Sequence, residues 1–231
     1  MLADLETPLS AYLKVGGHPS FLLESVEQGE RIARYSFIGT GARRRIEARG
    51  EKVTVSTPDG IDTFESKDPL RILWDMTVAE SDTPEELPDF WSGAVGFASY
   101  DLIRLYEDLP NNNPDELNIP DLLFIEPEVL VIFDHLARRV YIVAPAIEGD
   151  SFDEARAASI VNETHDRLRG PLPGVPGDRA GEMTEFKSNF SRDSYMEAVR
   201  RSVEYIRAGD VFQVVPSQRL SADLGVHPFA V

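Results

Sequence analysis

The hydrophobic residues of the first forty positions fall in short runs with turn residues between them. Phe21–Leu23 forms one run and Tyr35–Ile38 another, and polar Glu24 and Ser25 follow the first directly. Short apolar runs bounded by turn residues indicate strands, so we expect a buried strand and a second strand that closes over the Glu-Ser pair. A carboxylate and a hydroxyl beside an apolar floor are typical of a small-molecule pocket. The alternative is a hairpin in which Ser25 only satisfies a neighbouring backbone group.

Two β-hairpins are predicted further along the chain. Ala42–Ala48 and Lys52–Ser56 flank a turn that contains glycine, and Val129–Asp134 and Arg139–Ala144 flank a turn that begins at His135. β-Branched runs around such turns are typical of antiparallel strand pairs. The run Arg43–Arg45 is expected to form a solvated strand face or local salt bridges, rather than an anion site.

Three amphipathic helices are predicted from capping residues and apolar spacing. The first begins at Asp68-Pro69, the second begins at a Ser151-x-x-Glu154 capping box and ends at Gly170, and the third runs from Ser191 to Gly209. The buried face of the first helix is expected to carry Leu70, Leu73 and Trp74, and that of the second Ala157, Ile160, Val161, Thr164 and Leu168. The buried face of the third helix is expected to carry Tyr195, Val199, Val203 and Ile206.

The order of these elements predicts an α+β fold, with antiparallel sheets and packed helices. Residues 1–170 are expected to form an N-terminal domain, and the Pro- and Gly-rich segment within 171–186 is expected to be a linker. Residues 187–231 are predicted to open a second domain, with the third helix followed by a strand over Asp210–Ser221. Because Pro216 cannot donate to a ladder, it marks an edge or a bulge of that strand.

The composition and charge of the chain exclude or disfavour several classes of function. The 231 residues carry 23 Lys and Arg against 40 Asp and Glu, a formal charge of −17, which disfavours nucleic-acid binding. Such an acidic, lysine-poor composition favours a salt-adapted (halophilic) source. The absence of cysteine excludes disulfides, zinc–thiolate sites and cysteine nucleophiles. No apolar run is long enough to span a membrane and the first residues do not read as a signal peptide, so we expect a cytoplasmic protein without membrane contact.

Two linked blocks carry a resemblance to a known family. Leu22-Leu23-Glu24-Ser25, followed by Arg34-Tyr35-Ser36-Phe37-Ile38-Gly39, resembles the N-terminal signature of the large subunit of anthranilate synthase. Trp91–Glu107 resembles the family's Gly-Gly-x-Gly…Tyr-Asp segment, and the block that ends at Ser221 resembles the start of its chorismate-binding domain. The resemblance implies conversion of chorismate and ammonia or glutamine to anthranilate and pyruvate in tryptophan biosynthesis. It also implies a tryptophan feedback site to which Leu23, Glu24 and Ser25 belong.

The same resemblance implies Mg²⁺ as cofactor and a glutamine amidotransferase subunit as partner. In the family, the glutamates that hold the metal, the catalytic histidine and the carboxylate-binding loop correspond to polypeptide beyond Val231. The Asn-Pro-x-Pro-Tyr-Met segment of the tryptophan pocket corresponds to the same part. We therefore assign no catalytic residue and no metal ligand here, and expect a truncated chain that is inactive alone.

Two other interpretations remain open from the sequence. The large subunit of aminodeoxychorismate synthase is expected to share the fold and the substrate, although its product differs. A non-catalytic module that binds an amino acid or a partner protein is also consistent with the missing motifs.

Overall fold

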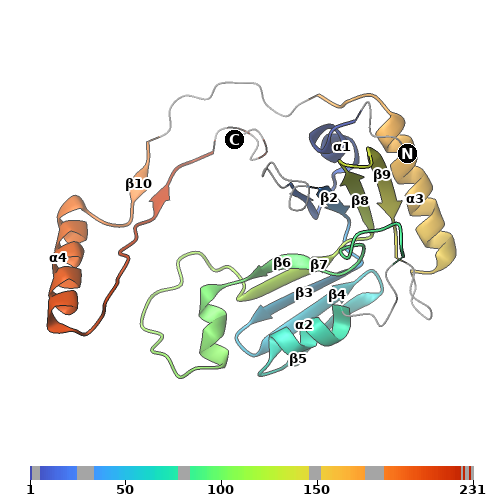
Figure 1. Cartoon of the computed structure of the whole chain (residues 1–231). Coiled ribbons are helices and arrows are strands. Elements are labelled where there is room, and N and C mark those ends of the chain that lie inside the picture. Colours follow the sequence, from blue (N-terminus) through green and yellow to red (C-terminus); the bar gives the residue numbers. More distant parts are fainter. Residues whose placement is uncertain are drawn as a thin grey trace. The chain divides into compact units, whose positions relative to one another are not determined.

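The computed structural model describes residues 1, 6–24, 34–77, 84–145, 152–174, 185–224, 226 and 229. The chain divides into two compact units, Met1–Pro173 and Gly174–Val231. The predicted α+β class is confirmed, because antiparallel sheets and packed helices make up the first unit (Figure 1). The assignment of 1–170, 171–186 and 187–231 to functional domains stays a prediction.

The first unit contains two antiparallel sheets, here called sheet A and sheet B. Sheet A has the strand order β1-β2-β8-β9, and sheet B has the order β5-β4-β3-β7-β6. The predicted hairpins are confirmed as β3–β4 and β8–β9. The strands are β1 (Ser20–Leu23), β2 (Tyr35–Thr40), β3 (Arg44–Arg49), β4 (Lys52–Thr57), β5 (Gly60–Glu65), β6 (Val95–Ala98), β7 (Leu122–Glu126), β8 (Val129–Asp134) and β9 (Arg139–Val143).

The inner face of sheet A packs against two helices, α1 (Pro8–Val15) and α3 (Glu154–Arg169) (Figure 1). Thr7 starts α1 through a reciprocal capping box with Ser10, and Pro8 fits the first helical position, where no amide donor is needed. The residues of this core are Ala11, Val15, Ile38, Val131, Phe133, Val140 and Leu168.

The start of α3 differs from the prediction. Ser151 lies outside the described residues, and the side chain that caps the helix is Asp153, which accepts from the Arg156 amide at 2.8 Å. The capping-box assignment was wrong because Glu154 is the first helical residue, not the third. The predicted end at Gly170 is confirmed, as is the burial of Ala157, Thr164 and Leu168.

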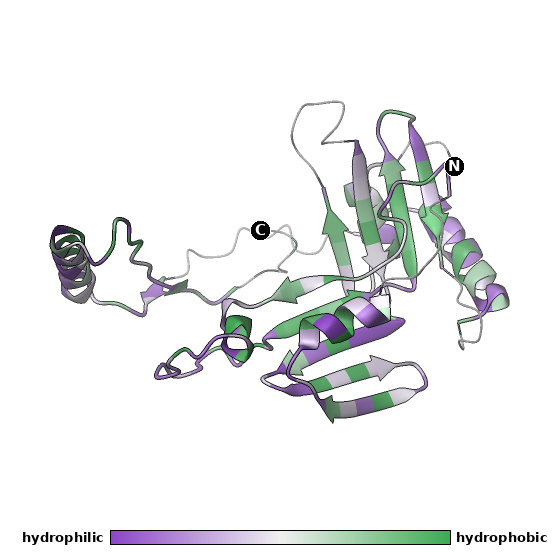
Figure 2. Cartoon of the chain, turned by 60° about the horizontal axis from the view of Figure 1, so that its bottom comes forward, coloured by the Kyte–Doolittle hydropathy of each residue, from purple (hydrophilic) through white to green (hydrophobic). Residues whose placement is uncertain are grey.

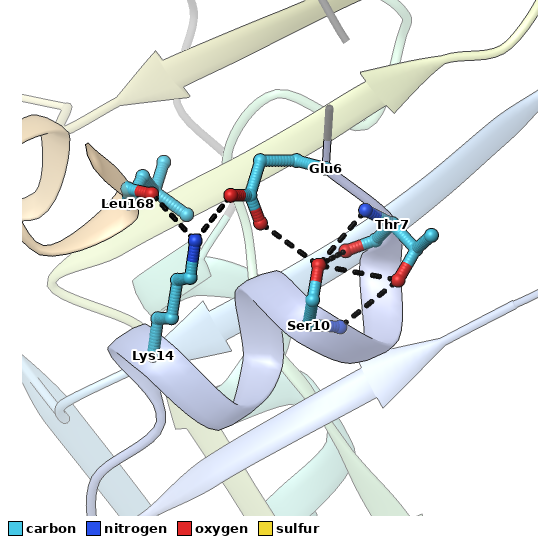
Figure 3. A network of polar contacts seen from close by, with 5 residues as sticks. All are labelled: Glu6, Thr7, Ser10, Lys14 and Leu168. Carbon is cyan, nitrogen blue, oxygen red and sulfur yellow. Dashed lines mark hydrogen bonds and ion pairs between the residues drawn. The ribbon is translucent and has the colours of Figure 1, made fainter. Parts of the chain in front are cut away.

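A buried polar network fastens α1 to the end of α3 (Figure 3). The Lys14 ammonium pairs with the Glu6 carboxylate and donates to the carbonyl of Leu168 at 2.9 Å. Both charged side chains are only about a tenth exposed, at 9% and 11%. Lys14 therefore supplies a cation where the α3 dipole leaves unpaired carbonyl groups.

Sheet B forms a separate core with α2 (Pro69–Thr77) and the 3₁₀ helix η1 (Tyr100–Leu105). β4 alternates hydrophobic and polar residues (Figure 2), as expected for a strand with one covered face, whereas in the edge strand β5 only Phe64 is half-buried. In β6, a Cβ on Gly96 would stand 1.9 Å from the Leu123 carbonyl oxygen, so β7 approaches this strand too closely for any residue but glycine.

The buried face of α2 differs from the prediction. Ile72, Leu73 and Met76 pack on sheet B, whereas Leu70 and Trp74 are 42% and 61% exposed. Both sets have helical spacing, since this short helix carries apolar residues around most of its circumference. Packing on sheet B, rather than periodicity, decides which stripe is covered.

Two chain segments pass between sheet A and sheet B, since β2 is followed by β3 and β7 is followed by β8. Where these segments bend, they form a corner that the two sheets share. Thr40 pairs with Val129 in sheet A, and Arg44 pairs with Glu126 in sheet B. Three residues of one strand, Gly41 to Arg43, therefore stand opposite two of the other, which is the count of a β-bulge. Gly41 has a φ of +74° and a Cβ there would contact the Glu128 side chain at 2.8 Å, so this position requires glycine.

The predicted salt bridges of the Arg43–Arg45 run are confirmed and hold this corner. Glu126 is 3% exposed and accepts from Arg43 at 2.8 Å and from Arg44 at 3.0 Å. Arg43 also donates to the Pro145 carbonyl after β9 at 3.4 Å, and Arg44 donates to the Met76 carbonyl at the end of α2. Arg43 is 8% exposed, so the alternative of a solvated strand face is wrong for this residue.

The second unit contains α4 (Arg192–Ala208) and the short pair β10 (Lys187–Ser188) and β11 (Leu220–Ser221). The predicted cap at Ser191 and left-handed end at Gly209 are confirmed. No residue of α4 is buried, and Val199, Val203 and Ile206 are 40–44% exposed, so the predicted buried stripe is uncovered. The predicted strand over Asp210–Ser221 was wrong, because only its last two residues join a ladder among those described.

Replacing Glu126 with glutamine should destabilise the first unit. The change leaves the Arg43 and Arg44 guanidinium groups at a buried position without their carboxylate, which typically costs about 3 kcal/mol or more. Urea unfolding of the E126Q chain measures the loss. The control is Glu47→Gln, whose partners Arg45 and Arg49 are 49% and 44% exposed, and for which a loss under about 1 kcal/mol is expected. Equal losses in the two variants would contradict the role of the corner.

Candidate effector site

Two of the predicted site residues, Leu23 and Glu24, lie at the β1 edge of sheet A. β1 is an edge strand, and its last residue, Leu23, stands opposite Phe37 of β2. Leu23 is 42% exposed and Glu24 is exposed, whereas Ser25 lies outside the described residues. The prediction of a buried first strand was therefore wrong, because among the described residues β1 has a neighbouring strand on one side only.

The outer face of sheet A carries two rows of residues in register. One row runs through Leu23, Phe37, Ile132 and Tyr141 across all four strands. In the next row the Phe21 ring lies over Gly39, where a Cβ would meet ring atoms at 2.2 Å. Directly paired residues share one face of a sheet, so these rows lie opposite the face that α1 and α3 cover.

An aromatic cluster surrounds Phe37 on this outer face. The Phe90 ring, from the segment before β6, meets Phe37 edge-on at 5.1 Å between centroids and 70° between planes. The Tyr35 ring lies 6.1 Å from Phe37 on the other side. Such tilted arrangements are favoured between aromatic rings. The cluster gives the exposed Leu23 and Glu24 an apolar, aromatic neighbourhood.

An ion pair between the partly exposed Arg34 and the buried Asp134 lies at one end of this face. The Arg34 guanidinium donates to both oxygens of Asp134, at 2.7 Å for its closest contact, and lies over the Tyr35 ring at 4.8 Å. Asp134 is 2% exposed and also accepts from the amides of Leu136 and Ala137 at 3.1 and 2.9 Å. These contacts pin the start of β2 to the β8–β9 turn.

The same contacts set the ionisation of the pair. Burial alone would raise the pKa of Asp134, but the Arg34 guanidinium and the two backbone amides outweigh it and lower the pKa overall. The pKa of Tyr35 is raised, first because burial disfavours the phenolate and then because the Asp134 carboxylate is near. The carboxylate of Asp134 is therefore held ionised.

A serine and a histidine meet beside this pair, but their geometry does not make a nucleophile. Ser36 Oγ lies 2.8 Å from Nε2 of His135, whose exposed ring stacks on Phe133. Ser36 is 2% exposed and belongs to the inner face of the sheet, where no substrate reaches it. Asp134 is directed to Arg34 and therefore does not serve His135 as the orienting carboxylate of a catalytic triad.

The described part of the chain shows no constellation for a metal ion. No group of three or more histidine or acidic side chains in it is placed to hold one. The described residues therefore do not fit the Mg²⁺ site that the family resemblance implies. The resemblance itself assigns the ligands of that site to polypeptide that this chain does not include. No helix within the described ranges is long and apolar enough to cross a membrane.

Sequence reasoning missed the residues that surround the predicted site. Arg34 and Phe37 lie within the quoted signature, yet their partners Asp134 and Phe90 are far away in sequence. No local pattern marks Phe90, because its neighbour is determined only when its segment folds over sheet A.

The Asp134 ion pair predicts a specific dependence of stability on pH. A carboxyl whose folded pKa is lowered contributes stability above its unfolded pKa of about 3.9, and this contribution is lost as pH falls through the folded value. We expect Asp134→Asn to lower the free energy of unfolding at about pH 7. The gap, which is the difference in this free energy between the variant and the parent chain, should narrow towards about pH 3.

Urea unfolding at several pH values measures that gap. The control is Asp75→Asn, which removes an exposed pair with Arg71 on α2 and should change stability by less than about 0.5 kcal/mol. A gap for Asp134→Asn that stays constant with pH would contradict the ionised pair.

Comparisons with known proteins agree along the whole chain. A family of chorismate binding enzymes matches residues 18–231. Anthranilate synthase component 1 of Thermus thermophilus is 51% identical over 100% of this chain and 48% of its own length. The corresponding protein of Pseudomonas aeruginosa is 37% identical over 98% of this chain and 48% of its own length.

A solved structure shares the fold. The crystal structure of anthranilate synthase component I from Streptococcus pneumoniae TIGR4 superposes with a TM-score of 0.75 at 26% identity, and covers 99% of this chain and 50% of that one. The chain thus spans about half the length of the relatives it matches.

Proposed function

The chain belongs to the family of chorismate binding enzymes, and on that premise we propose that it forms the N-terminal part of an anthranilate synthase large subunit. The observation that carries this proposal is the 51% identity to an anthranilate synthase component 1 along the entire chain. The complete enzyme converts chorismate and ammonia, or glutamine, to anthranilate and pyruvate. A glutamine amidotransferase subunit supplies the ammonia, and Mg²⁺ binds to residues outside this chain.

Within that enzyme, the edge of sheet A forms part of a tryptophan feedback site. Leu23 supplies exposed apolar surface, Glu24 supplies a carboxylate for the ligand's ammonium group, and Ser25 is assigned from the family resemblance. Tryptophan inhibits because it binds more tightly to the state of the enzyme that binds chorismate poorly.

The reaction itself tests the proposal. The complete enzyme that carries this chain should release anthranilate and pyruvate in equal amounts from chorismate with ammonia, measured by anthranilate fluorescence and a coupled pyruvate assay. The 231 residues alone should release neither. Formation of aminodeoxychorismate without pyruvate would instead identify the large subunit of aminodeoxychorismate synthase. Tight tryptophan binding by the chain in the absence of any synthase activity of the complete protein would favour a non-catalytic module.

A bulky residue at position 25 should relieve feedback. In the complete enzyme, Ser25→Phe is expected to raise the tryptophan concentration for half-inhibition by roughly tenfold or more, since it fills space that the effector needs. Turnover without tryptophan should be preserved. Ser159→Phe, on the exposed side of α3, serves as the control. Unchanged sensitivity of Ser25→Phe would remove this residue from the site.

We further propose that the protein is cytoplasmic, and that it is salt-adapted because its formal charge is −17. Added salt shortens the Debye length from about 10 Å at 0.1 M to about 3 Å at 1 M and so weakens repulsion between acidic groups. We expect the melting temperature of the chain to rise by several degrees, roughly, over this range of KCl. The rise should shrink near the isoelectric point of about 4.6. A melting temperature that falls with salt at neutral pH would contradict the proposal.

A further inference from the structure

We propose that Phe90, together with Phe37, forms the aromatic wall of the effector site and gives it a preference for planar aromatic amino acids. This inference rests on the proposed feedback site and deepens it. It assigns a specificity role to a residue that lies outside the signature of the family resemblance.

The register of sheet A places the wall beside Leu23. Leu23 and Phe37 are direct cross-strand partners, so their side chains stand on the same face, about 5 Å apart at Cβ. The Phe90 ring meets Phe37 at 5.1 Å, and therefore lies on this same outer face. Leu23 and Phe90, from two other segments, thus both neighbour Phe37 on this face.

Burial along the row shows where a ligand has room. Ile132, in the middle of the row, is fully buried, whereas Leu23 at its end is 42% exposed. The exposed end is apolar and is followed at once by the exposed carboxylate of Glu24. Apolar surface with one acidic group beside it complements a molecule with a flat apolar part and a cationic head.

An aromatic amino acid has this combination of groups. Its ring contacts Leu23 and the Phe37–Phe90 pair, and its ammonium group faces Glu24. Aromatic rings gain from edge-to-face or offset contacts beyond the area that they bury, whereas a saturated ring of similar size does not. The site should therefore distinguish the two classes by roughly three- to tenfold in affinity through this wall.

The experiment compares two ligands on matched variants of the complete enzyme. Calorimetry measures the Kd of L-tryptophan and of 3-cyclohexyl-L-alanine, which keeps the apolar bulk and lacks a π-system. Phe90→Leu should weaken tryptophan roughly three- to tenfold and leave cyclohexylalanine nearly unchanged. Phe90→Tyr retains the ring and should restore tryptophan affinity. Phe97→Leu, the same change at a partly exposed ring on β6, is the control.

The outcomes separate this inference from the proposed function. If the parent enzyme does not bind tryptophan, the feedback site itself is overturned and this inference with it. If the parent binds but Phe90→Leu leaves both affinities unchanged, or weakens both equally, only the role of Phe90 is overturned. Should Phe90→Leu fail to fold, Phe37→Leu decides the same question by the same ratio of affinities.

Discussion

The corner at Gly41, where the paired strands pass from sheet A into sheet B, is the constraint on which the first unit depends. The segment β2–β3 and the segment β7–β8 each contribute a strand to both sheets. Neither sheet can therefore shift without moving the other. The extra residue of the bulge bends the paired strands, and the Glu126 carboxylate pairs with both arginines that the bend brings together. Buried charges are tolerated there because each guanidinium also meets a backbone carbonyl, of Pro145 or Met76, from a neighbouring element.

This corner determines which surfaces remain available for binding. The inner face of sheet A is covered by α1 and α3, and the Lys14 network joins these helices at the end of α3. The outer face instead ends in an open edge at β1, where Leu23 and Glu24 are exposed. A rigid scaffold with exposed residues at a strand edge is suited to an effector site, because the site residues stand on strands held in register.

Much of the local structure was predictable from the residues themselves. Both hairpins, the cap at Ser191 and the glycine ends of α3 and α4 follow from backbone sterics and hydrogen bonding within a few positions. Apart from the cap of α3, the errors concern faces and partners. Trp74 was expected inside and is exposed, and the strand after Gly209 lacks a partner over most of its length among the described residues.

By itself, the sequence determined the class of fold, the positions of most strands and helices, and the linked blocks that resemble one enzyme family. These properties depend on short-range chemistry, which periodicity and turn residues express directly. Only the tertiary structure decided that Arg34 meets Asp134, that Phe90 covers Phe37, and that Glu126 lies between Arg43 and Arg44. Such pairs join residues some fifty to a hundred positions apart, and strand register and packing, not local propensity, bring them together.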